Sequence, residues 1–136
     1  MAARRRIDVA AGRAAVEAWV RAAGPSLHAP DAATARDASP APDRAMTATA
    51  VRYTLEELGL RAPGRSVEVR VPPFGAVQCI EGTTHRRGTP PAVIETDAAT
   101  WLALATGTLA WEDAVASGAV QASGERTDLA ALLPLT

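Results

Sequence analysis

Residues 92–123 read AVIETDAATWLALATGTLAWEDAVASGAVQAS, and in this stretch the residue pattern changes from strand period to helical period and back again. It begins as a short strand rich in β-branched residues, and after Asp97 its large apolar residues recur at helical spacing. Gly107 and Gly118 are suited to end two successive helices. The predicted elements are a strand at 92–96, a helix at 98–106, a short helix at 110–117 and a strand at 119–123.

Two more strands are predicted upstream. Residues 66–71, SVEVRV, alternate with period two, so three valines point to a core while Glu68 and Arg70 point outward. The pair Pro72-Pro73 interrupts the ladder, and residues 74–81 resume it as an antiparallel neighbour or a strand at the sheet edge. A polar stretch then predicts an exposed turn before the strand at 92–96.

Helical spacing appears in three further segments, 9–23, 44–60 and 127–133. The first two each follow an aspartate that can cap a helix. Residues 25–42 between them are mostly Ala, Pro, Asp, Ser and Thr, which predicts a linker or an extended arm. The first helix is therefore either an appendage or packs back on the main body, and the sequence leaves both open. Helices and few strands in this order indicate an α+β fold.

The composition limits the class of protein. The chain has 136 residues, a net charge of −1 and one cysteine, Cys79, which fits one soluble domain with no disulfide. A lone thiol suits a reducing compartment, so a cytoplasmic location is expected. The apolar runs fall far short of the roughly 20 residues of a membrane span. Residues 1–65 carry ten Arg and seven acidic residues, and residues 66–136 four and eight, so neither half resembles a nucleic-acid binder.

Motifs for catalysis are weak in this sequence. Residues 59–66, GLRAPGRS, resemble a phosphate loop, but a helix precedes them and a strand follows, the reverse of the order that binds phosphate. Cys79 within a strand pattern is more often a small buried hydrophobe than a nucleophile, and His85 lies beside two arginines in a polar turn. A site built from them is the least favoured hypothesis. No enzyme, cofactor or metal is predicted.

Residues 96–124 carry a resemblance to a known family. Their strand, two short helices and strand, with the stops at Gly107 and Gly118, are similar to the signature of the sterol carrier protein family, specifically its small actinobacterial group of bacterial sterol-carrier orthologs. The segments VRYTLEEL and VPPFGAVQ, which begin at Val51 and Val71, are similar to the same group. The resemblance covers residues 44–136. Residues 1–43 are expected to be an N-terminal helix with an Ala/Pro-rich arm.

The resemblance implies a curved, mostly antiparallel sheet of four to five strands, with helices packed on one face and, in many members, an apolar tunnel between them. It also implies a non-enzymatic carrier of a hydrophobic, lipid-like ligand, because each buried methylene contributes roughly 0.8 kcal/mol without polar specificity. The predicted pocket wall consists of aromatic and large aliphatic residues: Tyr53, Phe74, Val77, Trp101, Leu104, Leu109, Trp111, Val115 and Leu132.

Trp101 and Trp111 leave a second hypothesis open. Two bulky aromatics in neighbouring short helices can wall a pocket, or they can fill it as ordinary core. With a filled pocket and an additional N-terminal helix, the chain would be a protein-interaction or homo-oligomerisation module, for example a homodimer.

Overall fold

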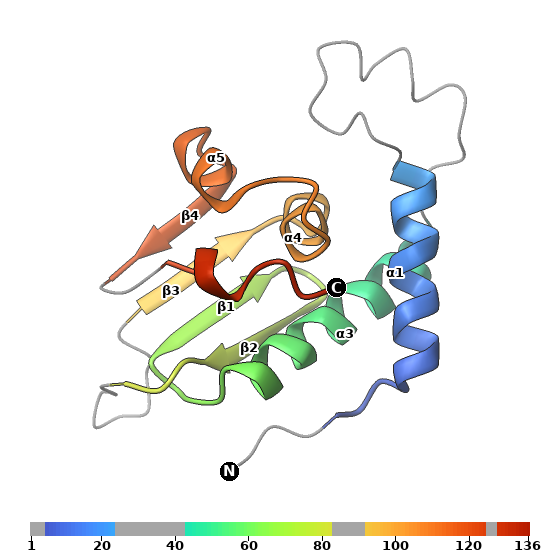
Figure 1. Cartoon of the computed structure of the whole chain (residues 1–136), viewed down its shortest axis with the longest axis horizontal. Helices are drawn as coiled ribbons and strands as arrows, with labels where there is room; N and C mark the ends of the chain where they lie inside the picture. The colour runs from blue at the N-terminus through green and yellow to red at the C-terminus, as the bar shows by residue number, and fades with distance from the viewer. Residues whose placement is uncertain (1–4, 24–42, 83–91, 125–127) are drawn as a thin grey trace.

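The computed structural model describes residues 5–23, 43–82, 92–124 and 128–136, and Figure 1 shows their arrangement. In chain order the elements are α1 (Val9–Ala23), α3 (Arg44–Arg61), β1 (Val67–Val71), β2 (Gly75–Cys79), β3 (Ala92–Thr96), α4 (Ala98–Ala105), α5 (Trp111–Ala116), β4 (Val120–Ser123) and a 3-10 turn, η1 (Ala130–Leu132). The predicted α+β class, its four strands and its additional N-terminal helix are confirmed. The predicted arm at 25–42 and most of the turn before β3 lie outside the described residues.

The four strands form one open, mixed sheet in the order β2-β1-β3-β4. The β1–β2 and β3–β4 pairs are antiparallel, whereas β1 and β3 at the centre run parallel. In this register Val69 lies opposite Val77 on one side and Ile94 on the other. Strand β2 lies at the sheet edge, next to β1, as the Pro72-Pro73 interruption predicts.

Side-chain caps and glycines set the helix boundaries. The carboxylates of Asp43 and Asp97 accept hydrogen bonds from backbone N–H groups three residues further on, at 2.7 and 2.8 Å. These bonds satisfy N–H groups that have no partner within the helix. Gly107 and Gly118 have φ values of +82° and +79°, which favour glycine, so the chain turns there after α4 and α5.

The core lies between one face of the sheet and the helices. Val69 and Ile94 on that face are almost fully buried, as are Leu58 of α3 and Leu102 of α4. The alternate residues of β1, Glu68 and Arg70, lie on the opposite face, as the period-two pattern predicts. Burial of the apolar row on one face fixes which way the sheet faces.

Helix α1 packs against α3 and stands apart from the strands (Figure 1). Its buried residues are Gly12, Ala15, Val16 and Trp19. Helix α1 is therefore part of the folded body, which decides between the two alternatives that the sequence leaves open. Val20 follows the buried Val16 by four residues and so lies on a neighbouring part of the helix surface, but it is 40% exposed. Among the described residues, no helix combines the length and the apolar character that crossing a membrane requires.

The C-terminal segment differs from its prediction. A helix is predicted over 127–133, but the described part of this segment holds only the single turn η1. Leu129 and Leu135 are both buried, and the Leu135 N–H donates to the carbonyl of Ala105 at 2.8 Å. To bury both leucines and bond to the end of α4, the segment runs along the core instead of continuing as a helix. These tertiary contacts outweigh the helical preference that its spacing of leucines indicates.

Candidate functional site

A groove of about 1030 Å³ opens on the side of α3 that faces α1. Ligand pockets commonly measure roughly 300–1,000 Å³, so the groove lies slightly above that range. Its lining comes from four segments: α1, α3, the loop that follows α4, and the C-terminal residues 134–136. The C-terminus ends close to α3 in Figure 1, which places it at the groove.

Helix α1 supplies the longest wall. Five of its residues line the groove: Arg13, Val16, Glu17, Val20 and Arg21. Positions three and four apart on a helix share one face, so these residues form one continuous strip. The strip lies beside the face that packs on α3, and Val16 belongs to both. Helix α1 therefore buries one face and presents a second, mixed face to the groove.

The opposite wall combines apolar and hydroxyl groups. Tyr53 and Leu135, exposed by only 3% and 2%, contribute apolar surface. Thr106 and Thr108 also line the groove, and their hydroxyl oxygens lie 3.2 Å apart. Glu57 and Arg61, at the C-terminal end of α3, also line the groove. The groove thus offers both apolar contact and hydrogen-bonding groups, as ligand pockets do.

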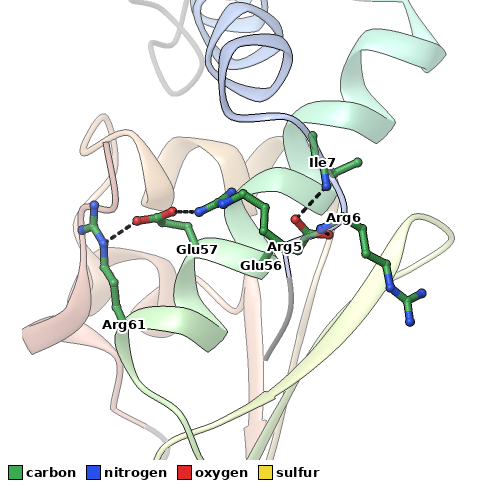
Figure 2. A network of polar contacts seen from close by, with 6 residues as sticks. All are labelled: Arg5, Arg6, Ile7, Glu56, Glu57 and Arg61. Carbon is green, nitrogen blue, oxygen red and sulfur yellow. Dashed lines mark hydrogen bonds and ion pairs between the residues drawn. The ribbon is translucent and has the colours of Figure 1, made fainter. Parts of the chain in front are cut away.

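A polar network ties the chain ahead of α1 to α3 (Figure 2). The Glu56 carboxylate accepts hydrogen bonds from the backbone N–H groups of Arg6 and Ile7, at 3.0 and 3.1 Å. The Arg5 guanidinium donates to Glu57 and also lies 4.8 Å from the centre of the Tyr53 ring. These contacts hold the start of α1 in place from a distance of about 50 residues along the chain.

Glu57 is the centre of this network. It accepts a second hydrogen bond from Arg61 Nε at 3.0 Å. Burial by itself would raise the pKa of Glu57, but the hydrogen bonds and charges of Arg61 and Arg5 outweigh it, so the pKa lies below its ordinary value. The carboxylate is therefore ionised at neutral pH and links the N-terminal segment to the end of α3.

Replacing Glu57 by glutamine is expected to lower the free energy of unfolding by about 1 kcal/mol at pH 7. A carboxyl whose pKa is lowered by folding stabilises the folded state above its unfolded-state pKa, and this contribution disappears as the pH falls through the lower, folded-state value. The difference between Glu57→Gln and wild type should therefore shrink below pH 4.5. Urea denaturation at a series of pH values measures it. Glu17→Gln, in an exposed residue of the same sign, is the control, and an equal effect of both changes would contradict the assignment.

The structure distributes the nine predicted wall residues over several environments. Tyr53 lines the groove. Trp101 and Leu104 are 1% exposed and belong to the core, and Trp111 is 8% exposed. The others that are half-buried pack against this core: Phe74, Val77, Leu109 and Leu132. Val115 is 43% exposed on α5, so it does not join them.

Most residues of the groove are absent from the sequence-based prediction. Arg13, Glu17 and Arg21 recur every four residues on α1, a pattern that is typical of an ordinary solvent-exposed face. Only the apolar Val20 beside this row could have signalled a binding surface. These residues line a groove only because α1 packs against α3. The sequence alone does not predict that packing.

Cys79 lies on the edge strand β2 and is completely buried. Burial raises the pKa of its thiol to about 11. The thiol therefore stays protonated at neutral pH, whereas nucleophilic cysteines are thiolates in partly exposed, electropositive surroundings. The interpretation of Cys79 as a small buried hydrophobe is confirmed, while His85 lies outside the described residues.

Comparison with known proteins agrees with the resemblance found in the sequence. Residues 43–135, the part of the chain that follows α1 and the arm, match the family model described as bacterial SCP ortholog, where SCP stands for sterol carrier protein. A search of curated proteins finds no match. The family assignment indicates lipid binding or transfer in general, and the family consists mainly of non-enzymatic lipid carriers. The matched region contains α3, the whole sheet and both short helices, so this chain belongs to the bacterial SCP ortholog family, within the sterol carrier proteins.

Proposed function

We propose that this protein binds a lipid-like molecule without catalysing a reaction, and that the ligand occupies the groove between α1, α3 and the C-terminal residues. The single observation that carries the proposal is the groove itself, with a volume of about 1030 Å³, in a member of a lipid-carrier family. The sequence predicts a lipid-like ligand in a pocket between sheet and helices. The site proposed here is instead the groove, which lies on the side of α3 that faces α1.

The burial of side chains supports this position. The helix-facing residues of β1, Val67, Val69 and Val71, are completely buried by protein atoms. Val20, in contrast, is an apolar side chain with 40% of its surface exposed in the groove. An apolar ligand that covers Val20 removes this surface from water, and each methylene that it buries in turn contributes roughly 0.8 kcal/mol.

Native mass spectrometry of the freshly purified protein, followed by organic extraction and lipid analysis, is the direct test. We expect a bound species near one equivalent that yields an amphipathic or apolar molecule on extraction. A mass that equals the polypeptide alone, together with no binding of fluorescent lipid probes, would contradict the proposal. Light scattering would then test the homo-oligomerisation module that the sequence offers as the alternative.

Val20→Asp is expected to weaken binding of a lipid probe at least about tenfold, because the ligand would bury a carboxylate without a partner. The fold should be unaffected, since Val20 is exposed. Val9→Asp is the matched control: Val9 lies on the same helix, is 39% exposed and is not part of the groove lining. Fluorescence titration of both variants measures the difference. Equal affinities would place the ligand elsewhere.

A further inference from the structure

The polar contacts of the N-terminal segment converge on two neighbouring side chains of α3. Among the described residues, each hydrogen bond that joins residues 5–23 to the rest of the chain ends on Glu56 or Glu57. The Glu56 carboxylate uses both of its oxygens, Oε1 for the N–H of Arg6 and Oε2 for the N–H of Ile7. A protonated carboxyl or an amide would instead place a donor against one of these N–H groups. The start of α1 is therefore held by an acceptor that fits only when it is ionised.

Arg5 makes the attachment sensitive to the charge of Glu57. Its guanidinium is half-buried, lies over the Tyr53 ring at 4.8 Å from the ring centre, and pairs with the Glu57 carboxylate. Its Nη1 atom is buried and makes no hydrogen bond to any described residue. Neutralising one partner of such a pair leaves the other charge uncompensated and away from water. A neutral Glu57 would therefore drive Arg5 out toward solvent, and residues 5–7 with it.

The rest of the protein is held together differently. In the described part of the chain, the hydrogen bonds that join α3, α4 and the sheet to their neighbours involve no carboxylate. The bond from Trp101 to Thr54 between α4 and α3, for example, joins two neutral groups. A third ion pair, between Glu68 and Arg70, lies on the open face of the sheet. Carboxylate-dependent contacts between elements are thus concentrated where α1 is attached.

Other charged groups surround Glu56 and Glu57. Arg52 and Arg61 lie one helical turn away on α3. The N-terminal segment, α1 and the C-terminal end contribute the rest: Arg5, Arg6, Asp8, Arg13, Glu17, Arg21 and the terminal carboxylate of Thr136. Among the described residues, Arg5 and Arg61 alone form ion pairs with Glu57. Burial would raise the pKa of Glu57, but these two cations lower it below its ordinary value, so the pair with Arg5 persists at neutral pH and is lost in acid, below pH 4.5.

We infer that residues 5–23 form a latched unit, which Glu56 and Glu57 hold on α3 only while they are ionised, and which separates from a folded body when they are neutralised. In the closed state α1 covers Tyr53 and supplies the longest wall of the groove. In the open state that wall is absent. The latched unit lies outside residues 43–135, so the body that remains is the part that matches the family model. The inference goes beyond the proposed function and does not depend on what the groove binds.

Hydrogen exchange of the full chain at pH 7 tests the latch without any ligand. In Glu56→Gln/Glu57→Gln we expect the amides of α1 to exchange at least about tenfold faster than in wild type, while those of α4 stay within about twofold. Unchanged exchange in α1 would overturn the inference. Equally faster exchange in α1 and α4 would also overturn it, because the body would then open together with α1.

Glu68→Gln/Glu95→Gln is the matched control. It also removes two carboxylates and one ion pair, and the side chains of Glu68 and Glu57 are exposed to nearly the same extent, 18% and 19%. Both replaced residues lie on the open face of the sheet, away from the core. Exchange in α1 should equal that of wild type. The same acceleration as in the Glu56/Glu57 variant would reveal a general effect of charge and overturn the assignment to these two residues.

Acid is a second way to open the latch, in the unmodified chain. Protection is expressed relative to the exchange rate of an unstructured chain at the same pH. Between pH 7 and about pH 3.5, the protection of α1 should fall at least about tenfold, and that of α4 should fall less. The fall in α1 should be smaller in Glu56→Gln/Glu57→Gln, because the two titrating groups are gone. An equal fall in wild type and in this variant would overturn the pH dependence of the latch.

Discussion

Replacing Trp101 by alanine is expected to lower the free energy of unfolding by about 3–5 kcal/mol, the largest effect of any single change considered for this protein. Trp101 is 1% exposed, and its indole Nε1 donates a hydrogen bond to Thr54 Oγ1 at 2.8 Å. The change therefore leaves a cavity and removes a buried hydrogen bond. Small domains are stable by only about 5–15 kcal/mol, so a large fraction of the total would be lost. Urea denaturation followed by circular dichroism measures it.

The hydrogen-bond part of this effect can be separated. Thr54→Val keeps the shape of the side chain but leaves the buried Trp101 N–H without an acceptor, which should cost about 1–3 kcal/mol. Thr49→Val is the matched control on the same helix, because the Thr49 hydroxyl likewise donates to a carbonyl four residues earlier but has no tryptophan partner. If both variants lose the same stability, the Thr54–Trp101 bond contributes nothing specific.

Gly12→Ala is expected to destabilise the docking of α1 on α3 by about 1–3 kcal/mol and to abolish most ligand binding in the groove. A Cβ atom at Gly12 would lie 2.1 Å from Tyr53 Cδ1 and 2.9 Å from Tyr53 Cβ. The near part of the Tyr53 side chain belongs to α3 and cannot swing away, so the two helices must separate. At an exposed position in a helix, replacing glycine by alanine stabilises the helix by about 1 kcal/mol. A destabilising effect at Gly12 would therefore indicate the close contact with Tyr53.

Hydrogen exchange of the α1 amides measures this docking locally, and a lipid-probe titration measures the groove. Tyr53→Ala provides the control in a double-mutant cycle, because Gly12→Ala should cost clearly less when the Tyr53 ring is absent. A Gly12→Ala variant with unchanged exchange and unchanged affinity would show that the close approach of α1 and α3 is not required.

The predictive power of the sequence differs between the fold and the groove. Strand β1 and helices α3 and α4 follow from period, caps and stops, so their boundaries agree with the structure to within one or two residues. The final helix predicted over 127–133 is wrong in extent, since contacts of Leu129 and Leu135 with the core outweigh helical spacing. The proposed pocket wall shares only Tyr53 with the groove lining.

Three tertiary contacts explain this difference. The parallel pairing of β1 with β3, the ion pair of Arg5 with Glu57 and the contact of Gly12 with Tyr53 all join segments that are distant in sequence. Arg5 and Glu57, for example, are 52 residues apart. No local pattern encodes such a contact, because it depends on the shape that each element presents once it has formed.

By itself, the amino-acid sequence determined the α+β class, the four strands, the caps of the helices and the family resemblance over residues 44–136. These features depend on neighbours along the chain, through periodicity, capping and turn chemistry. Only the tertiary structure decided that α1 is part of the body, that Gly12 admits the Tyr53 ring, and that the row from Arg13 to Arg21 faces a groove. Those outcomes depend on close packing between distant segments, where one added methyl group changes the fit.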